Sequence, residues 1–160
     1  VPASVDLAQA VVLAPEEVRL LTIGSEEFFA YHVSQEGRVR LRYRVAVNGL
    51  SILPSLHLYD LVGTPLLSAL DHSPQWHGVA RPAGVYETLV SIPAFLLNEG
   101  HFTLAVSLST LLPFRNHLYV ADVLQIKVYD PMDGTTAIGQ HKGPLSGYFR
   151  PKLEWQTRPA

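Results

Sequence analysis

The sequence predicts an all-β fold, and three observations lead to that prediction. Apolar and polar residues alternate in many short segments, as in strands that bury one face. No long segment free of Pro, Gly and β-branched runs shows the apolar spacing of an amphipathic helix. Turn sequences such as Asn48-Gly49 and Asp133-Gly134 separate the alternating segments. Because the crossover helices of a parallel sheet are missing, we expect an antiparallel β-sandwich of immunoglobulin-like or jelly-roll topology.

The clearest strand runs from Arg38 to Val47, where four arginines alternate with apolar residues. Weaker strands are predicted at Ser4 to Leu13, Val18 to Ile23, Glu27 to Val33, Leu56 to Asp60, Val85 to Ile92, Phe102 to Leu108, Val123 to Tyr129 and Tyr148 to Trp155. Pro93 to Asn98 could form one helical turn at a corner between the sheets. Long loops are expected at Asp71 to Gly84 and at Leu111 to His117.

Composition narrows the possible functions. The 160 residues include 12 Lys and Arg against 14 Asp and Glu, so the charge of −2 offers no general attraction to nucleic acid or anionic lipid. There is no Cys, no apolar run long enough to span a bilayer, no GxxxxGK[ST] phosphate loop and no GxSxG elbow. We therefore expect no catalytic residue, no cofactor and no direct membrane insertion. The opening Val-Pro-Ala-Ser suggests that residues 1–160 are one domain cut from a longer polypeptide.

Several late motifs occur together in one order: Val90-Ser91-Ile92-Pro93, Leu96 to Leu104 (LLNEGHFTL), Val123 to Val128 (VLQIKV) and Gly147 to Trp155 (GYFRPKLEW). An earlier segment, Tyr59 to Leu66 (YDLVGTPL), belongs to the same pattern. Over about residues 18 to 155 the chain resembles the Wzt-type carbohydrate-binding domain, the C-terminal part of the ATPase subunit in ABC transporters that export lipid-linked polysaccharides such as O antigen.

The resemblance implies a non-catalytic, glycan-binding sandwich in the cytoplasm, at the inner face of the cell membrane. The ATPase would lie in an upstream domain, and the partners would be the polysaccharide and the ATPase and membrane subunits of the transporter. It also implies a homodimer, which members of this family can form by exchanging their last strand. In this chain that strand would be Tyr148 to Trp155.

Arg40, Arg42 and Arg44 are the first candidate glycan-binding residues. In a regular strand, side chains two residues apart emerge on one face about 7 Å from each other. Guanidinium groups in such a row repel one another, and an acidic sugar, a phosphate cap or neighbouring carboxylates would relieve that repulsion. A solvated face, or an edge strand protected by charge from aggregation, explains the row equally simply.

A second candidate set is polar and alternates with core residues: His57 and Tyr59, then Gln125 and Lys127. If these strands neighbour the arginine strand, one sheet face gathers an aromatic ring, an imidazole, an amide and several cations. Sugar hydroxyls need such donors and acceptors, and an aromatic surface suits the C–H face of the ring. The competing interpretation is that every two-sheet protein has polar outer faces.

Trp76 is the last candidate, because a large ring in a loop either packs back onto the fold or contacts a ligand. Its neighbours Asp71, His72 and His77 lack a third partner and a fixed helical spacing, so no metal is predicted. Two rival functions remain: a purely structural dimerisation or docking sandwich, and an extracellular adhesin-like sandwich.

Overall fold

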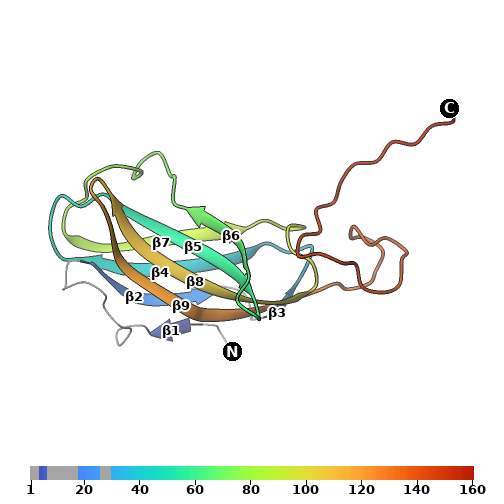
Figure 1. Cartoon of the computed structure of the whole chain (residues 1–160), viewed down its shortest axis with the longest axis horizontal. Coiled ribbons are helices and arrows are strands. Elements are labelled where there is room, and N and C mark those ends of the chain that lie inside the picture. The colour runs from blue at the N-terminus through green and yellow to red at the C-terminus, as the bar shows by residue number, and fades with distance from the viewer. Residues whose placement is uncertain (1–3, 7–17, 26–29) are drawn as a thin grey trace.

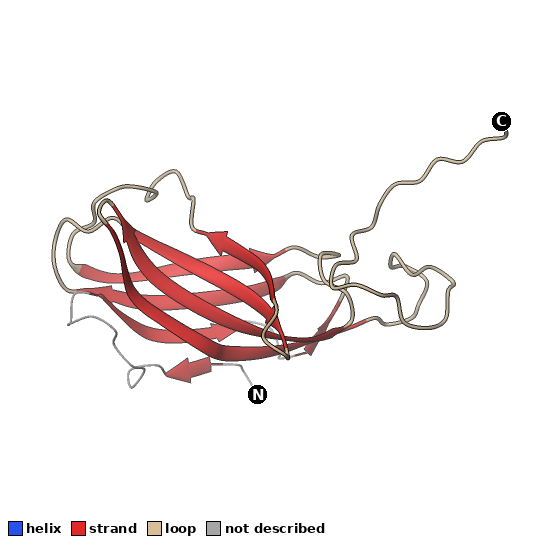
Figure 2. Ribbon diagram, in the orientation of Figure 1, coloured by secondary structure: helices blue, strands red, loops and turns tan. Residues whose placement is uncertain are grey.

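The computed structural model describes residues 4–6, 18–25 and 30–160. These form two stacked sheets with loops at both ends, and no helix lies within the described ranges, so the predicted all-β sandwich is confirmed (Figures 1 and 2). The strands are β1 (Ser4–Asp6), β2 (Val18–Ser25), β3 (Ala30–His32), β4 (Gly37–Val45), β5 (Ile52–Asp60), β6 (Pro65–Leu70), β7 (Gly84–Ile92), β8 (Gly100–Leu111) and β9 (Phe114–Tyr129).

One sheet has four strands in the order β1-β2-β4-β7, and the other has five in the order β3-β9-β8-β5-β6. Every pairing is antiparallel except that of β3 with β9, which is parallel. The predicted strands at residues 4–13 and 27–33 are described at Ser4–Asp6 and Ala30–His32. Residues 7–13 and 27–29 lie outside the described part of the chain.

The core lies between the two sheets and follows the alternation in the sequence. On β4, Val39, Leu41, Tyr43 and Val45 are buried, and every residue between them is exposed. On the opposite sheet, alternate residues of β5, β8 and β9 close the core from the other side. Because successive side chains of a strand point to opposite faces, one apolar residue in two is enough to build each layer.

The prediction of a long loop at Leu111 to His117 is wrong. Leu112 and Pro113 alone separate β8 from β9, which pair as one long hairpin. Residues from Phe114 onward belong to β9, where Arg115 and Asn116 lie in the ladder with β8. The strand β6 was not predicted, because Leu66 and Leu67 are adjacent and break the alternation; pairing with β5 places it in the sheet.

Two further predictions fail near the C-terminal side. Pro93 to Asn98 forms no helical turn, since the Phe95 N–H donates to the carbonyl of Val33 and Leu97 bridges to Phe149. Tyr148 to Trp155 is not a strand: Phe149 makes that isolated bridge, and residues 151–160 extend away from the sandwich without secondary structure (Figure 1). A strand needs an edge to pair with, and none of the described segments pairs with this tail.

Candidate functional site

The outer face of the five-stranded sheet brings together His57, Tyr59, Gln125 and Lys127. The strands β5, β8 and β9 are neighbours, and their register places Tyr59 opposite Thr103 and Thr103 opposite Gln125. Two residue pairs along, and so on the same face, Lys127 lies opposite His101. Half of the predicted site therefore shares one surface, although its role in binding stays a prediction.

The centre of this face is a pair of tyrosines. The hydroxyls of Tyr59 and Tyr119 are 2.8 Å apart, and the rings of Tyr119 and His57 have centroids 5.7 Å apart. We call the surface formed by His57, Tyr59, Thr103, Tyr119 and Gln125 the tyrosine face. The outward residues of β8 beneath these rings are small. Larger side chains from β5 and β9 cover these small residues and bury them.

The imidazole of His57 is held between two hydroxyls. One ring nitrogen, Nδ1, lies 2.8 Å from Ser68 Oγ, and the other, Nε2, lies 3.2 Å from Ser107 Oγ. Burial lowers the pKa of His57 from its ordinary value of 6.5 because desolvation disfavours the charged ring. The hydrogen bond with Tyr59 is the largest cause that raises the pKa of Tyr119 to about 12, so the Tyr119 phenol is protonated at neutral pH.

A pocket of about 390 Å³ opens beside the tyrosine pair at the end of the sheet. Its residues are Tyr59, Asp60, Leu61, Val62, Gly63, Thr103, Tyr119, Ala121 and Asp122. The turn after β5 forms its outer rim, where Leu61 and Val62 are exposed. Two phenols, a hydroxyl and two carboxylates line it, and no lysine or arginine does.

Sequence reasoning missed Tyr119 and Asp122. A bulge separates the two regular parts of β9: Leu124 pairs with Leu104 and Val120 pairs with Val106, so extra residues of β9 have no counterpart on β8. Asp122 takes a left-handed φ of 51° in this bulge, a conformation that non-glycine residues adopt at a cost. The alternation from Leu118 to Val120 was the signal that could have extended the strand to Tyr119.

The arginine row lies on the other sheet. Arg40, Arg42 and Arg44 are exposed on β4, and β4 pairs with β2 and β7 rather than with β5 or β9. The condition under which the two candidate sets would share one polar face is therefore not met, because the core separates them. Neighbouring carboxylates relieve part of the repulsion: Glu87 lies 3.5 Å from Arg40, and Glu36 lies 3.6 Å from Arg38.

Trp76 packs back onto the fold. Its ring meets Tyr86 edge-on with centroids 5.6 Å apart, and the guanidinium of Arg81 lies 5.2 Å from its centroid. Arg81 is buried, donates to the carbonyl of Ile52 and contacts the hydroxyl of Tyr43. Trp76 thus covers a buried cation at the opposite end of the sandwich from the pocket, which explains a large ring in this loop.

The neighbouring histidines have backbone partners. Nδ1 of His72 lies 3.2 Å from the carbonyl of Leu70, and Nδ1 of His77 lies 3.1 Å from that of Asp71. Within the described ranges, no three His, Asp or Glu side chains are grouped as metal ligands. In the same ranges, no helix has the length and apolar character needed to cross a bilayer.

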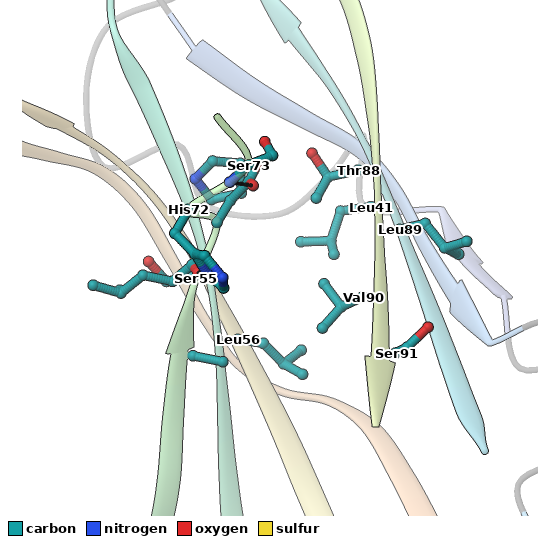
Figure 3. A pocket seen from close by; sticks show the side chains of 13 residues that line it. Leu41, Ser55, Leu56, His72, Ser73, Thr88, Leu89, Val90 and Ser91 are labelled. Atoms are coloured by element: carbon teal, nitrogen blue, oxygen red, sulfur yellow. Dashed lines mark hydrogen bonds between the residues drawn. The ribbon is translucent and has the colours of Figure 1, made fainter. Parts of the chain in front are cut away.

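A second pocket, of about 350 Å³, lies between β6 and β7, the edge strands of the two sheets. Figure 3 shows Leu41, Leu56 and Val90 between these strands, with Thr88 and His72 nearby. We call this pocket the edge slot. Core side chains reach it because none of the strands in the described ranges closes the sandwich on this side.

No protein-family model matches the chain, and no curated protein matches its sequence. A crystal structure of the C-terminal domain of Wzt matches over 96% of this chain and 96% of its own, with a TM-score of 0.70 and 13% sequence identity. The chain has the fold of the C-terminal domain of Wzt.

The resemblance to the Wzt-type domain is thus confirmed at the level of the fold. At 13% identity the likeness does not carry individual residues from one protein to the other. The pocket, the tyrosine pair and the edge slot rest on the side chains of this chain alone. They are the two cavities and the polar surface described for this sandwich.

Proposed function

We propose that the chain is a non-catalytic glycan-binding module and that the tyrosine face binds the saccharide. The contact of 2.8 Å between the hydroxyls of Tyr59 and Tyr119, beside the pocket, is the observation that carries the proposal. A sugar presents C–H groups to an aromatic ring and hydroxyls to nearby donors and acceptors. The two phenols supply both kinds of contact, and Thr103 and Asp122 add hydrogen-bonding groups beside them.

The fold of the Wzt C-terminal domain and the late sequence motifs support a more specific role. In this role the chain recognises a lipid-linked polysaccharide of the O-antigen type, on the cytoplasmic side, before an ABC transporter exports it. An upstream domain would hydrolyse ATP. The arginine row has no part in the proposed site, because it lies on the opposite face of the sandwich.

Binding of the chain to an array of neutral and acidic bacterial polysaccharides, followed by calorimetric titration of those retained, tests the proposal. Tyr119→Ala should weaken binding about tenfold, which corresponds to about 1.4 kcal/mol. Tyr129→Ala is a matched control, since both tyrosines lie on β9 and both are 37% exposed. Equal losses in the two variants, or no glycan retained by the wild-type chain, would contradict the proposal.

The rival function is a structural docking domain whose outer faces bind nothing. It predicts that Tyr119→Ala leaves polysaccharide export unchanged in a cell that carries the complete transporter. The glycan-binding proposal predicts lost export with an unchanged oligomeric state. Measuring both in the same variant separates the two functions.

We further propose that the chain forms a homodimer through its C-terminal tail, residues 151–160. Leu153 and Trp155 are 62% and 85% exposed, and their spacing would place them on one face of a strand. Burying two such side chains is worth about 1.5 to 3 kcal/mol each. The edge slot of a second copy supports the proposal as an acceptor, because it joins an apolar floor to β6 and β7, the edge strands of the two sheets among the described residues.

Cross-linking tests this dimer cleanly because the chain has no cysteine. We expect Trp155→Cys protein, mixed with Thr88→Cys protein, to form a mixed disulfide at the slot, which Thr88 lines. Arg42→Cys, on the outer face of the same sheet, is the control and should not cross-link. A Leu153→Asp, Trp155→Asp variant should be monomeric in light scattering, and a dimer that survives both changes would contradict the proposal.

A further inference from the structure

The turn that forms the rim of the 390 Å³ pocket is shaped by one carboxylate. Asp60 ends β5, and its Oδ1 accepts the backbone N–H of Val62 at 3.0 Å and that of Thr64 at 2.7 Å. The backbone of Asp60 closes the same turn through bonds with Gly63 and Thr64. Because Leu61, Val62 and Gly63 line the pocket, the position of this carboxylate fixes one of its walls.

The other oxygen of Asp60 reaches a segment 88 residues away. Oδ2 accepts the hydroxyl of Tyr148 at 2.7 Å. Asp60 is 7% exposed, and three donors share its two oxygens. The carboxylate therefore acts by holding other groups and contacts a ligand in the pocket less readily than Asp122 or the phenols do.

Tyr148 is itself fixed to the body of the sandwich. The carbonyl of Tyr148 accepts the N–H of Asn98 at 2.9 Å, and the Asn98 side chain donates to the carbonyls of Leu145 and Gly147. Two residues on, Arg150 donates its N–H to Leu96 and forms a buried ion pair of 2.5 Å with Asp130. The segment 145–150 thus connects the pocket rim to the point where the tail leaves.

We infer that Asp60 and Tyr148 are positioning residues that couple the C-terminal tail to the glycan pocket, so that tail-mediated dimerisation and glycan binding strengthen each other. The inference rests on the proposed function. When a second copy holds the tail, the hydrogen bond from Tyr148 to Asp60 is favoured. This bond in turn keeps the pocket rim in its ligand-binding shape. Linkage requires the effect to be reciprocal, so a bound glycan also favours the docked tail.

The ionisation of Asp60 is consistent with this arrangement. Burial alone would raise the pKa of Asp60, but hydrogen bonds from Tyr148, Thr64 and Val62 outweigh it and lower the pKa from its ordinary value of 3.8. The same contact raises the pKa of Tyr148. At neutral pH the carboxylate is charged and the phenol is protonated, which is the pair of states that the hydrogen bond needs.

Amide hydrogen exchange in Tyr148→Phe tests the connection without any glycan. This variant loses one hydroxyl, and we expect the Val62 and Thr64 amides to exchange roughly fivefold faster. Tyr129→Phe is the matched control and should leave both rates unchanged. The amides of Leu104 and Leu108 in the core report global destabilisation and should not change. Unchanged exchange at Val62 and Thr64 would overturn the inference.

Titration with a polysaccharide retained on the array tests whether the Tyr148 contact affects glycan binding. Tyr148→Phe should weaken binding roughly fivefold while Tyr129→Phe binds as the wild type does. Faster exchange with an unchanged glycan affinity would overturn the coupling to binding. If the wild-type chain bound no glycan, the proposed function would fail, and the exchange rates would still decide whether the Tyr148 hydroxyl holds the turn.

Discussion

At the scale of single residues, His57 links the chemistry of the tyrosine face to pH. Its folded pKa lies below the ordinary value of 6.5, so the neutral ring stabilises the fold. That contribution is present above pH 6.5 and is lost as the pH falls through the lowered folded pKa. The hydrogen bonds with Ser68 and Ser107 hold the ring in place in its neutral form.

Replacing His57 with Gln should therefore flatten the pH dependence of stability. We expect the free energy of unfolding to fall less between pH 7 and pH 5 in His57→Gln than in the wild type. Urea denaturation at both pH values measures the difference. His101→Gln, an exposed histidine on β8, serves as the control. Identical pH dependence in wild type and His57→Gln would show that the ring titrates alike in both states.

Arg150 is the residue on which the C-terminal segment depends. Its side chain is 4% exposed, and its partner Asp130 is 0% exposed. Asp130 also accepts the hydroxyl of Thr136. Arg150→Ala should cost about 3 kcal/mol of unfolding free energy, because it leaves a buried carboxylate without its cation.

Urea denaturation of Arg150→Ala, beside Arg158→Ala, measures this cost. Arg158 lies exposed in the tail, so its removal should change stability by less than about 0.5 kcal/mol. Equal effects of the two substitutions would mean that the ion pair with Asp130 is not buried as the structure has it.

At the scale of elements, β8 is the strand on which the five-stranded sheet is built. It pairs with β5 on one side and β9 on the other, and its inward residues lie in the core. Its outward residues between Thr103 and Ser109 are small, which leaves room for the rings of Tyr59 and Tyr119 above them. The strand therefore serves the core with one face and the candidate site with the other.

Leu108→Ala should lower the free energy of unfolding by about 3 kcal/mol, since truncating a buried leucine loses transfer energy and leaves a cavity. Leu112→Ala offers a matched control in the adjoining turn, where the leucine is 91% exposed. Its effect should be within about 0.5 kcal/mol. Chemical denaturation of both variants measures the contrast, and a small loss in Leu108→Ala would contradict the assigned core.

At the scale of the whole molecule, the sandwich separates two polar faces by its core. The arginine row covers one sheet and the tyrosine face covers the other. Ligand binding on one face should be independent of side chains on the other, because additivity holds for distant sites without shared partners.

An Arg42→Ser, Arg44→Ser variant should bind any array-positive glycan as tightly as the wild type. Calorimetric titration beside Tyr119→Ala measures this independence. A loss of binding in the arginine variant with none in Tyr119→Ala would move the site to the four-stranded sheet.

The sequence by itself determined the fold class and the facing of most strands. Alternation is a local property of an extended backbone, so Val39 and Leu41 could be assigned to the core, and Arg40 and Arg42 to the surface, without knowing the neighbours of β4. The same reasoning placed His57 and Tyr59 on one face of their strand and Leu56 and Leu58 on the other face.

Only the tertiary structure decided which faces lie together. Strand order depends on hydrogen bonds and packing between residues far apart in the chain, so β4 could not be separated from β5 and β9 by its pattern. The bulge that accompanies Tyr119, the pairing of β6, and the bond from Tyr148 to Asp60 are likewise long-range. The tail illustrates the same dependence on long-range pairing. Leu153 and Trp155 have the spacing of residues on one face of a strand, but a strand forms only where another edge accepts its hydrogen bonds.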